Sequence, residues 1–205
     1  MIPARLVRTV PEVIDQRVER YWQHACGLHV TWEHVTWRDP IDPINFPLTH
    51  DDWPRCSSGA QFAGLIRLED LYHRGGIYLD SDVQLFRSLE PFRRTGAFAA
   101  WEDDNVIPDA VLGAEPHHDA ISACLALALD RLRNGGDDWR TGRGAWATGP
   151  GVTSTIFPGR EDVLVLSPES FYPVHYTKKE QCDGYLPRPW TFGMHRWHAS
   201  WVAPT

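Results

Sequence analysis

Two aspartates one residue apart, Asp80 and Asp82, are the residues of this sequence whose types and spacing best suit metal chemistry. They follow a short apolar run, residues 77–79, which is typical of a strand buried in a sheet. In open α/β sheets, ligands bind where such strands end. If the strand continued, the two carboxylates would share a face and would repel each other unless a cation lay between them. The alternative interpretation is a solvated turn, because aspartate is common in turns.

The residues before this pair predict a helix over 58–74 that runs into a tight turn. Ser58 stands three residues before Gln61, which is a capping-box start, and Gly75 can end the helix in a left-handed conformation. Apolar residues recur at helical spacing and predict one buried stripe, while charged residues fill most other positions. The members of the stripe are Phe62, Leu65, Ile66, Leu68, Leu71 and Tyr72.

The stretch from Arg67 to Asp82 resembles the DxD signature of glycosyltransferases whose sugar-binding region reads R-x-x-x-L-Y-x-x-G-G-I-Y-x-D-x-D. That family includes the relatives of the yeast initiating α-1,6-mannosyltransferase, of α-1,4-galactosyltransferase and of capsular-polysaccharide transferases. The resemblance implies an α/β fold of the GT-A type, with a single Rossmann-like mixed sheet flanked by helices and one domain over residues 1–205. It also implies a nucleotide-sugar donor, a divalent metal and transfer with retention of anomeric configuration.

The C-terminal segment 194–201, MHRWHASW, resembles the closing H-h-W-x-x-S-W of the same family. By this match His195 joins the aspartates on the metal, and Ser200 and Trp201 bind the diphosphate of the donor. His198 is a second candidate ligand, although the motif favours His195. Taken alone, the segment is also compatible with an aromatic tail that docks onto the core.

The resemblance also implies a division of roles at the metal. Asp82 is the expected direct ligand, Asp80 holds the metal or the ribose, His195 completes the coordination, and Tyr78 belongs to the donor-binding set. A divalent cation on the two phosphates would stabilise the charge that the leaving group gains. Imidazole and carboxylate ligands suit Mn²⁺ better than Ca²⁺, so Mn²⁺ is the expected cofactor and Mg²⁺ the alternative.

Three further positions bear on the donor sugar. Arg67 matches a catalytic and donor-binding arginine of the family; the structural alternative is an ion pair with Asp70 or Glu102. Asp109 takes the place of a family asparagine in the donor site. Gly64 stands where the family commonly has an aspartate that contacts sugar hydroxyls. The last two departures leave the identity of the donor open.

Composition narrows the class of protein. A chain of 205 residues with 42% hydrophobic and 23% charged residues suits one ordinary globular domain. Its net charge of −7 argues against a duplex nucleic-acid partner, which requires a basic footprint. No window is long and apolar enough for a transmembrane segment, and the N-terminus lacks the apolar core of a secretory signal. Four cysteines without a C-x-x-C pair favour a reduced, cytoplasmic protein.

Elsewhere the pattern predicts the remaining elements of an α/β sheet. Strands are expected near 2–10 and at 30–37, 97–101, 111–114 and 163–166, and helices at 11–26 and from residue 116 onward. Loops are expected at 38–56 and 134–147. Residues 148–153 resemble a T-G-P segment of the family, and a loop there could present backbone N–H groups to a ligand.

Three hypotheses for function follow. The favoured one is a metal-dependent glycosyltransferase that moves a sugar from a nucleotide-sugar donor to an acceptor hydroxyl, with a UDP-sugar favoured over GDP-mannose. The alternative is a catalytically weak nucleotide-sugar or glycan-binding module with the same fold, which Gly64 and Asp109 support. A phosphohydrolase with a D-x-D motif fits poorly, because Val83 and Gln84 follow the pair and the motif lies mid-chain. The acceptor stays open, because its contacts come from loops that carry no transferable code.

Overall fold

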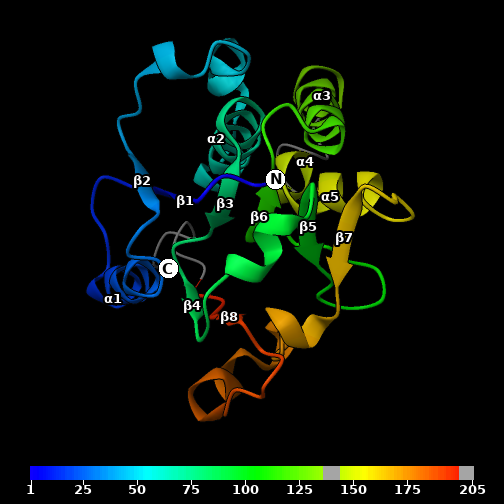
Figure 1. Cartoon of the computed structure of the whole chain (residues 1–205). Coiled ribbons are helices and arrows are strands. Elements are labelled where there is room, and N and C mark those ends of the chain that lie inside the picture. Colours follow the sequence, from blue (N-terminus) through cyan, green and yellow to red (C-terminus); the bar gives the residue numbers. More distant parts are fainter. Residues whose placement is uncertain (136–143, 199–205) are drawn as a thin grey trace.

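A six-stranded mixed sheet forms the centre of the molecule in the computed structural model, which describes residues 1–135 and 144–198 (Figure 1). The strands are β1 (Arg5–Val10), β2 (Glu33–Arg38), β3 (Gly76–Leu79), β5 (Ala97–Ala100), β6 (Val111–Ala114) and β7 (Val163–Leu166), with a separate pair of β4 (Val83–Leu85) and β8 (Gly193–His195). The helices are α1 (Gln16–Gly27), α2 (Gly59–Arg74), α3 (Asp119–Asn134), α4 (Gly144–Thr148) and α5 (Pro150–Ile156). Short 3-10 helices lie at Pro43–Asn45, His50–Arg55, Glu90–Arg94, Pro168–Ser170 and Tyr176–Gly184.

The order of the strands, β2-β1-β3-β6-β5-β7, decides which loops meet. β1 pairs in parallel with β2 and β3, and β5 pairs in parallel with β7. β6 lies between β3 and β5 and is antiparallel to both. The carboxyl ends of β3 and β5 therefore lie at the same edge of the sheet as the amino end of β6. This arrangement is the mixed sheet flanked by helices that was predicted.

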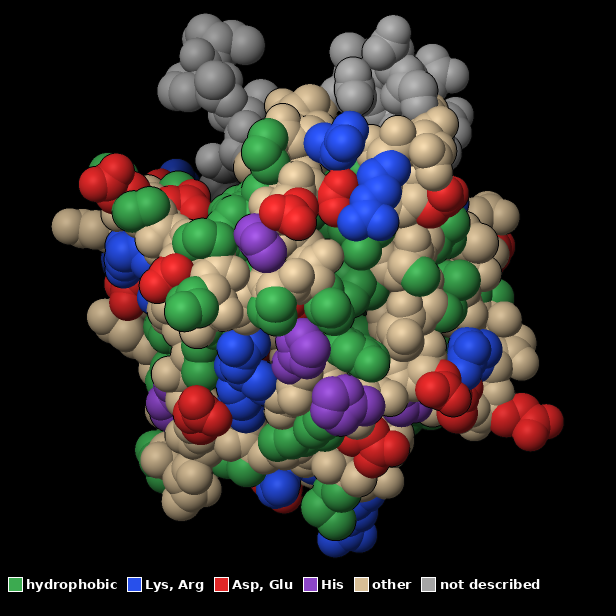
Figure 2. Space-filling view, turned by 90° about the horizontal axis from the view of Figure 1, so that it is seen from above, with side chains coloured by type: hydrophobic (Ala, Val, Ile, Leu, Met, Phe, Trp, Pro, Cys, Tyr) green, Lys and Arg blue, Asp and Glu red, His purple; other side chains and the backbone are tan. Residues whose placement is uncertain are grey.

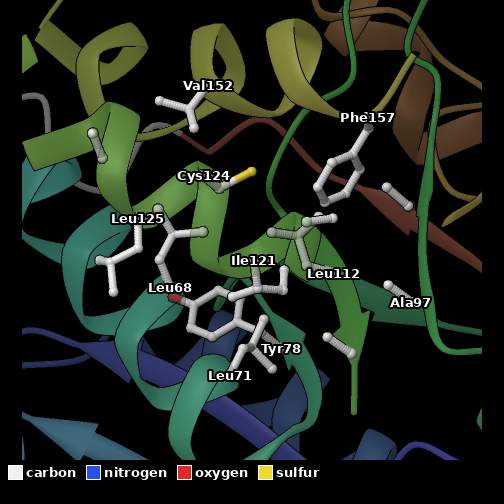
Figure 3. Close-up of a cluster of buried hydrophobic side chains, with 14 of the residues drawn as sticks. Leu68, Leu71, Tyr78, Ala97, Leu112, Ile121, Cys124, Leu125, Val152 and Phe157 are labelled. Atoms are coloured by element: carbon white, nitrogen blue, oxygen red, sulfur yellow. The ribbon is translucent and has the colours of Figure 1, made fainter. Parts of the chain in front are cut away.

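Side chains alternate along the strands and build a core on each face of the sheet. Tyr78 and Leu112 point into the core beneath α2, α3 and α5, where the ring of Tyr78 lies among Leu68, Leu71 and Ile121 (Figure 3). Ile77 and other alternating strand residues point to the opposite face, which α1 and β4 cover. A period of two in the strands thus supplies both layers.

Helix α2 begins and ends where the sequence predicts. The Ser58 side chain accepts the N–H of Gln61, and Gly75 follows the helix with φ 64°. The side chain of Gln61 does not close the capping box on Ser58; its Oε1 accepts the backbone N–H of Ser57 instead, at 2.6 Å. The single buried stripe was too narrow a prediction. The helix is buried almost all round, because α3, α4 and the loop before α2 cover the other faces, and the charged residues there are buried in ion pairs.

Five other predictions need correction. α3 begins at Asp119 rather than at residue 116, because His118 caps it by accepting the N–H of Ala120. α4 begins at Gly144, within the loop predicted at 134–147. α1 begins at Gln16 rather than at residue 11, because Asp15 caps it by accepting the N–H of Arg17. β2 begins at Glu33 rather than at residue 30. Residues 148–153 are not a loop: α4 ends at Thr148, and α5 begins at Pro150, whose fixed φ suits the first position of a helix.

The surface carries charges of both signs. On the face that Figure 2 shows, acidic, basic and histidine side chains are interspersed among apolar ones. Among the described helices, none has both the length and the apolar composition that crossing a bilayer requires.

Candidate active site

The sheet topology brings three acidic residues to one edge. Asp80 follows β3 and its N–H donates to the carbonyl of Ala110 at 2.8 Å, which continues the β3–β6 pairing by one bond. Asp109 therefore lies beside the end of β3, although it is 29 positions further along the chain. Glu102 follows β5 at the same edge. Asp109 and Glu102 enter the site because β6 is antiparallel to both neighbours.

Asp80 and Asp82 lie on a turn and not on a continuing strand. The N–H of Val83 donates to the carbonyl of Asp80 at 3.0 Å, which closes the turn after β3. Both aspartates are nevertheless buried, with exposed fractions of 6% for Asp80 and 2% for Asp82. Because the pair lies on a turn, the two carboxylates do not share one face of a strand. Because both are enclosed, the turn is not the solvated one that was the alternative.

The pairing of β4 with β8 delivers His195 to this turn. Val83 lies opposite His195 in the register of the two strands. Nε2 of His195 is 3.0 Å from Oδ1 of Asp82, and the N–H of His198 donates to Oδ2 of Asp82 at 2.8 Å. His198 thus contacts Asp82 through its backbone, while its ring stacks against Tyr21. One ligand atom from each of Asp80, Asp82 and His195 can be chosen so that all three lie within 4.8 Å of one another.

Electrostatics at this cluster favour charged aspartate. Burial raises the pKa of Asp82, but the charge and hydrogen bond of His195 and the N–H of His198 outweigh it and lower the pKa to about 2. Burial lowers the pKa of His195, and Asp82 more than compensates, so that the pKa is raised.

The cluster has the composition of a site for a divalent cation. Asp80, Asp82 and Asp109 are opposed by the single guanidinium of Arg67, which leaves two negative charges uncompensated when His195 is neutral. Two carboxylates and an imidazole are ligands that Mn²⁺ and Mg²⁺ accept. The donor set therefore fits the expected metal.

Arg67 reaches the site from the buried side of α2. Its Nη2 is 2.5 Å from Oδ1 of Asp80, its Nη1 contacts Asp109, and its Cζ lies 4.2 Å from the centre of the Tyr78 ring. The ion pairs with Asp70 or Glu102 that were the structural alternative are not formed; Asp80 and Asp109 are the partners. Tyr78 is 1% exposed and lies beneath the guanidinium, so it supports Arg67 from the core.

A cavity of about 470 Å³ opens above this cluster. Its walls comprise Ala60, Arg67, Asp80, Asp82, Glu102, Pro108, Asp109, Ala110, Ala145, Pro150, Tyr176, Thr177, Lys179, His195 and Trp197. Sequence reasoning missed the contribution of Tyr176, Thr177 and Lys179. They lie between the strand at 163–166 and the C-terminal motif, which begins 15 positions after Lys179, and no motif in the sequence marks them.

Gly64 is explained by packing. A Cβ at this position would lie 2.6 Å from Oγ1 and 2.7 Å from the carbonyl oxygen of Thr148, so α4 approaches the backbone of α2 too closely for any side chain. The hydroxyl of Thr148 donates to the carbonyl of Gln61 at 2.9 Å and fixes this approach. Gly64 does not line the cavity. Ser200 and Trp201, expected at the diphosphate, lie outside the described residues.

A known protein family matches nearly half of the chain. Residues 15–106 match the family described as glycosyltransferase sugar-binding region containing DXD motif. The resemblance to the DXD glycosyltransferases is confirmed. The matched region contains Arg67, Asp80, Asp82 and Glu102, whereas Asp109 and His195 lie beyond it.

Curated relatives of the DXD region carry mannosyl names. Mannosyl phosphorylinositol ceramide synthase SUR1 of Saccharomyces cerevisiae is 25% identical over 191 residues, which cover 81% of this chain and 48% of that protein. Inositol phosphoceramide mannosyltransferase 2 of Schizosaccharomyces pombe is 27% identical over 122 residues, which cover 53% of this chain and 35% of that protein. The chain thus spans from about a third to about half of the length of these relatives.

Solved structures with the same fold are glycosyltransferases by name. PaToxG glycosyltransferase superposes with a TM-score of 0.60 at 12% identity and covers 76% of this chain and 69% of that chain. Apo-form GlyE of Streptococcus pneumoniae gives 0.58 at 12% identity, with 96% and 55% covered. The galactosyltransferase LgtC, solved with donor and acceptor sugar analogues, gives 0.55 at 12% identity, with 93% and 86% covered. At this identity the likeness establishes the GT-A fold, as expected, and the expectation of a transferase enzyme agrees with all of these comparisons.

Proposed function

We propose that this chain is a metal-dependent glycosyltransferase, that residues 1–205 form a single GT-A domain, and that it transfers a sugar from a nucleotide-sugar donor to an acceptor hydroxyl. The observation that carries the proposal is the convergence of Asp80, Asp82 and His195 at the floor of one cavity. Two of these residues come from the DXD region, and the third comes from a strand 113 positions further along.

The residues of the floor divide the work. Asp82, Asp80 and His195 would hold a divalent cation, which when bound supplies positive charge to the diphosphate as it departs. Arg67 pairs with Asp80 and is fixed by Asp109 and the Tyr78 ring. Its guanidinium therefore has one orientation toward the donor sugar. Pre-positioned charge of this kind needs no rearrangement during the reaction.

The proposed reaction retains the anomeric configuration. The acceptor oxygen forms a bond to the anomeric carbon on the face from which the diphosphate leaves, the carbon–oxygen bond to the diphosphate breaks, and the departing phosphate takes the acceptor proton. This scheme needs no carboxylate nucleophile. Retaining glycosidases, in contrast, use one of their two carboxyl groups as the nucleophile.

The donor and the metal are finer parts of the proposal. From the sequence, Mn²⁺ is preferred over Mg²⁺, and a UDP-sugar over GDP-mannose. The mannosyl names of the curated relatives weigh against the second preference. Ser200 and Trp201 stay predicted diphosphate ligands, and a cytoplasmic location and the absence of a nucleic-acid partner stay predictions.

A thermal-shift panel tests the proposal. UDP-glucose, UDP-galactose, UDP-N-acetylglucosamine and GDP-mannose are each added with Mn²⁺, with Mg²⁺ or with EDTA, and release of nucleoside diphosphate is followed in parallel. A true donor raises the melting temperature only with metal, by mass action. His195→Gln should abolish this metal-dependent shift, whereas His24→Gln, an exposed histidine on α1, should preserve it. Stabilisation that is equal in Mn²⁺ and EDTA for every donor would contradict the metal site.

The alternative of a catalytically weak binding module is separated by the same panel. It predicts metal-dependent stabilisation without release of nucleoside diphosphate. Its sequence support is reduced, because Gly64 is required by the approach of Thr148 and Asp109 is engaged with Arg67 at the cavity wall.

A further inference from the structure

The floor of the cavity and its rim differ in burial and in chemistry. Its floor is buried and charged, with Arg67 and Asp80 almost without exposure. Its rim is formed by the start of the 3-10 helix Tyr176–Gly184, where Tyr176 is 56% exposed. At about 470 Å³ the cavity lies in the range that takes a drug-sized ligand. The donor sugar is proposed at the floor beside Arg67, so the rim is the part of the wall left for an acceptor.

An aromatic series leads from the metal cluster to the rim. The rings of His195 and Trp197 have centroids 4.0 Å apart, and Trp197 meets Tyr176 at 6.1 Å in an edge arrangement. Nε1 of Trp197 donates to the carbonyl of Val174 at 2.9 Å, which fixes the indole. Both Trp197 and Tyr176 line the cavity, so its wall on this side is aromatic from the floor to the opening.

Polar groups flank this aromatic wall. Glu102 is 9% exposed, and its Oε1 accepts the N–H of Tyr176 at 3.4 Å and lies 3.4 Å from Nε2 of His175. Its Oε2 makes no hydrogen bond within the described part of the chain, and Glu102 lines the cavity. His175 also bonds the hydroxyl of Thr177 through Nδ1 at 2.8 Å, so the rim is tied to the end of β5. Lys179 adds an exposed ammonium at the same opening.

We infer that this wall is the acceptor subsite and that it takes a pyranose ring, which packs on Tyr176 and donates a hydroxyl hydrogen bond to Oε2 of Glu102. An aromatic face suits the apolar face of a sugar ring, while a carboxylate and an ammonium suit its hydroxyls. The subsite is built from other residues of the cavity wall than Arg67 and Asp109, which leaves those two for the donor sugar. This inference rests on the proposed function for the position of the donor.

Binding of simple glycosides tests the subsite directly. Methyl α-glucopyranoside, methyl α-galactopyranoside and methyl α-mannopyranoside are titrated into protein loaded with Mg²⁺ and UDP, and in parallel with Mg²⁺ and GDP. Saturation-transfer difference NMR is the readout, and Mg²⁺ replaces Mn²⁺ because it is diamagnetic. We expect at least one to bind, with Tyr176→Ala weakening it by about tenfold and Tyr176→Phe nearly restoring it. Glu102→Gln should weaken it by about tenfold or more, because a charged hydrogen bond is lost.

Trp190 supplies a matched control for the substitution at Tyr176. Trp190→Ala removes another aromatic side chain, 52% exposed, that does not line the cavity, and it should leave glycoside binding unchanged. If nucleotide and metal fail to bind, the proposed function fails, and the glycoside titration is repeated without them to judge the subsite by itself. Absence of binding by all three glycosides, or equal binding by Tyr176→Ala and wild type, overturns the inference.

Discussion

Helix α2 presents two buried charged clusters three residues apart, and they differ in charge balance and in access. At Asp70 the carboxylate accepts four hydrogen bonds: Arg5 donates to its two oxygens at 2.6 and 3.0 Å, Trp37 donates at 3.0 Å and Arg74 at 3.3 Å. At Arg67 the charges are the other way round: the helix supplies the cation, and Asp80 and Asp109 supply the carboxylates. Asp70 has 0% exposure and does not line the cavity of the candidate site, whereas Asp80 and Asp109 form part of its wall.

The difference separates a structural carboxylate from the carboxylates proposed to be functional. Asp70 is enclosed, and its bonds to Arg5 and Trp37 hold α2 to β1 and β2. Asp80, Asp82 and Asp109 share fewer cations than they have charges, and they face a space that a ligand can enter. Burial alone does not distinguish the two clusters. They differ because the carboxylates near Arg67 outnumber their cationic partners and line a cavity, whereas Asp70 is matched by arginines and enclosed.

The largest expected effect is at the functional cluster. Asp82→Asn keeps the shape of the side chain but removes the charge that a cation requires, so release of nucleoside diphosphate should fall by about a thousandfold or more. Activity assays on folded protein check this, with the exposed Asp104→Asn as control. Activity within tenfold of wild type would mean that Asp82 belongs with Asp70.

The structural cluster should respond in the opposite way. Asp70→Ala removes the buried partner of Arg5 and leaves it, in the described part of the chain, only the exposed Glu33 as an ion-pair partner. Breaking a buried pair of this kind costs about 3–5 kcal/mol in free energy of unfolding. Urea unfolding measures this loss, and Asp130→Ala on the exposed side of α3 is the control. Activity per folded molecule should remain; a loss of activity without a loss of stability would contradict the comparison.

Gly64, between the cap and the two clusters, should be sensitive to size. Gly64→Ala places a Cβ within 3.0 Å of Thr148, and overpacking of this kind costs about 1–3 kcal/mol. Gly184→Ala, with nothing within 4 Å of the new Cβ, should change stability by less than about 0.5 kcal/mol. Equal stability of the two variants in urea would show that α4 moves away at little cost.

The smallest effect is at the cap that both clusters share. Ser58→Ala removes the hydrogen bond to the N–H of Gln61 and should cost about 1 kcal/mol. The corresponding fall in melting temperature is about 2–4 °C for a domain of this size. A differential melt of Ser58→Ala beside wild type measures it, and donor affinity should not change.

The sequence by itself determined the helix, the glycine turn, the strand and the aspartate pair. Their signals are local: a cap three residues from its donor, apolar spacing within one helix, and a glycine where φ becomes positive. The match of residues 15–106 to a family covers the same continuous stretch. The C-terminal histidine was found only because it sits in a recognisable motif.

Only the tertiary structure showed how distant residues reach this stretch and decided which of its charged residues are engaged in structural ion pairs. Asp109 and Glu102 join Asp80 because β6 runs antiparallel between β3 and β5, and His195 joins through the pairing of β8 with β4. The apolar periodicity of α2 does not separate Arg67 from Asp70, because both fall outside the predicted stripe; only the family signature marks Arg67. Their roles differ by what the rest of the chain packs against them, and that depends on the order and direction of strands, which no short window of sequence encodes.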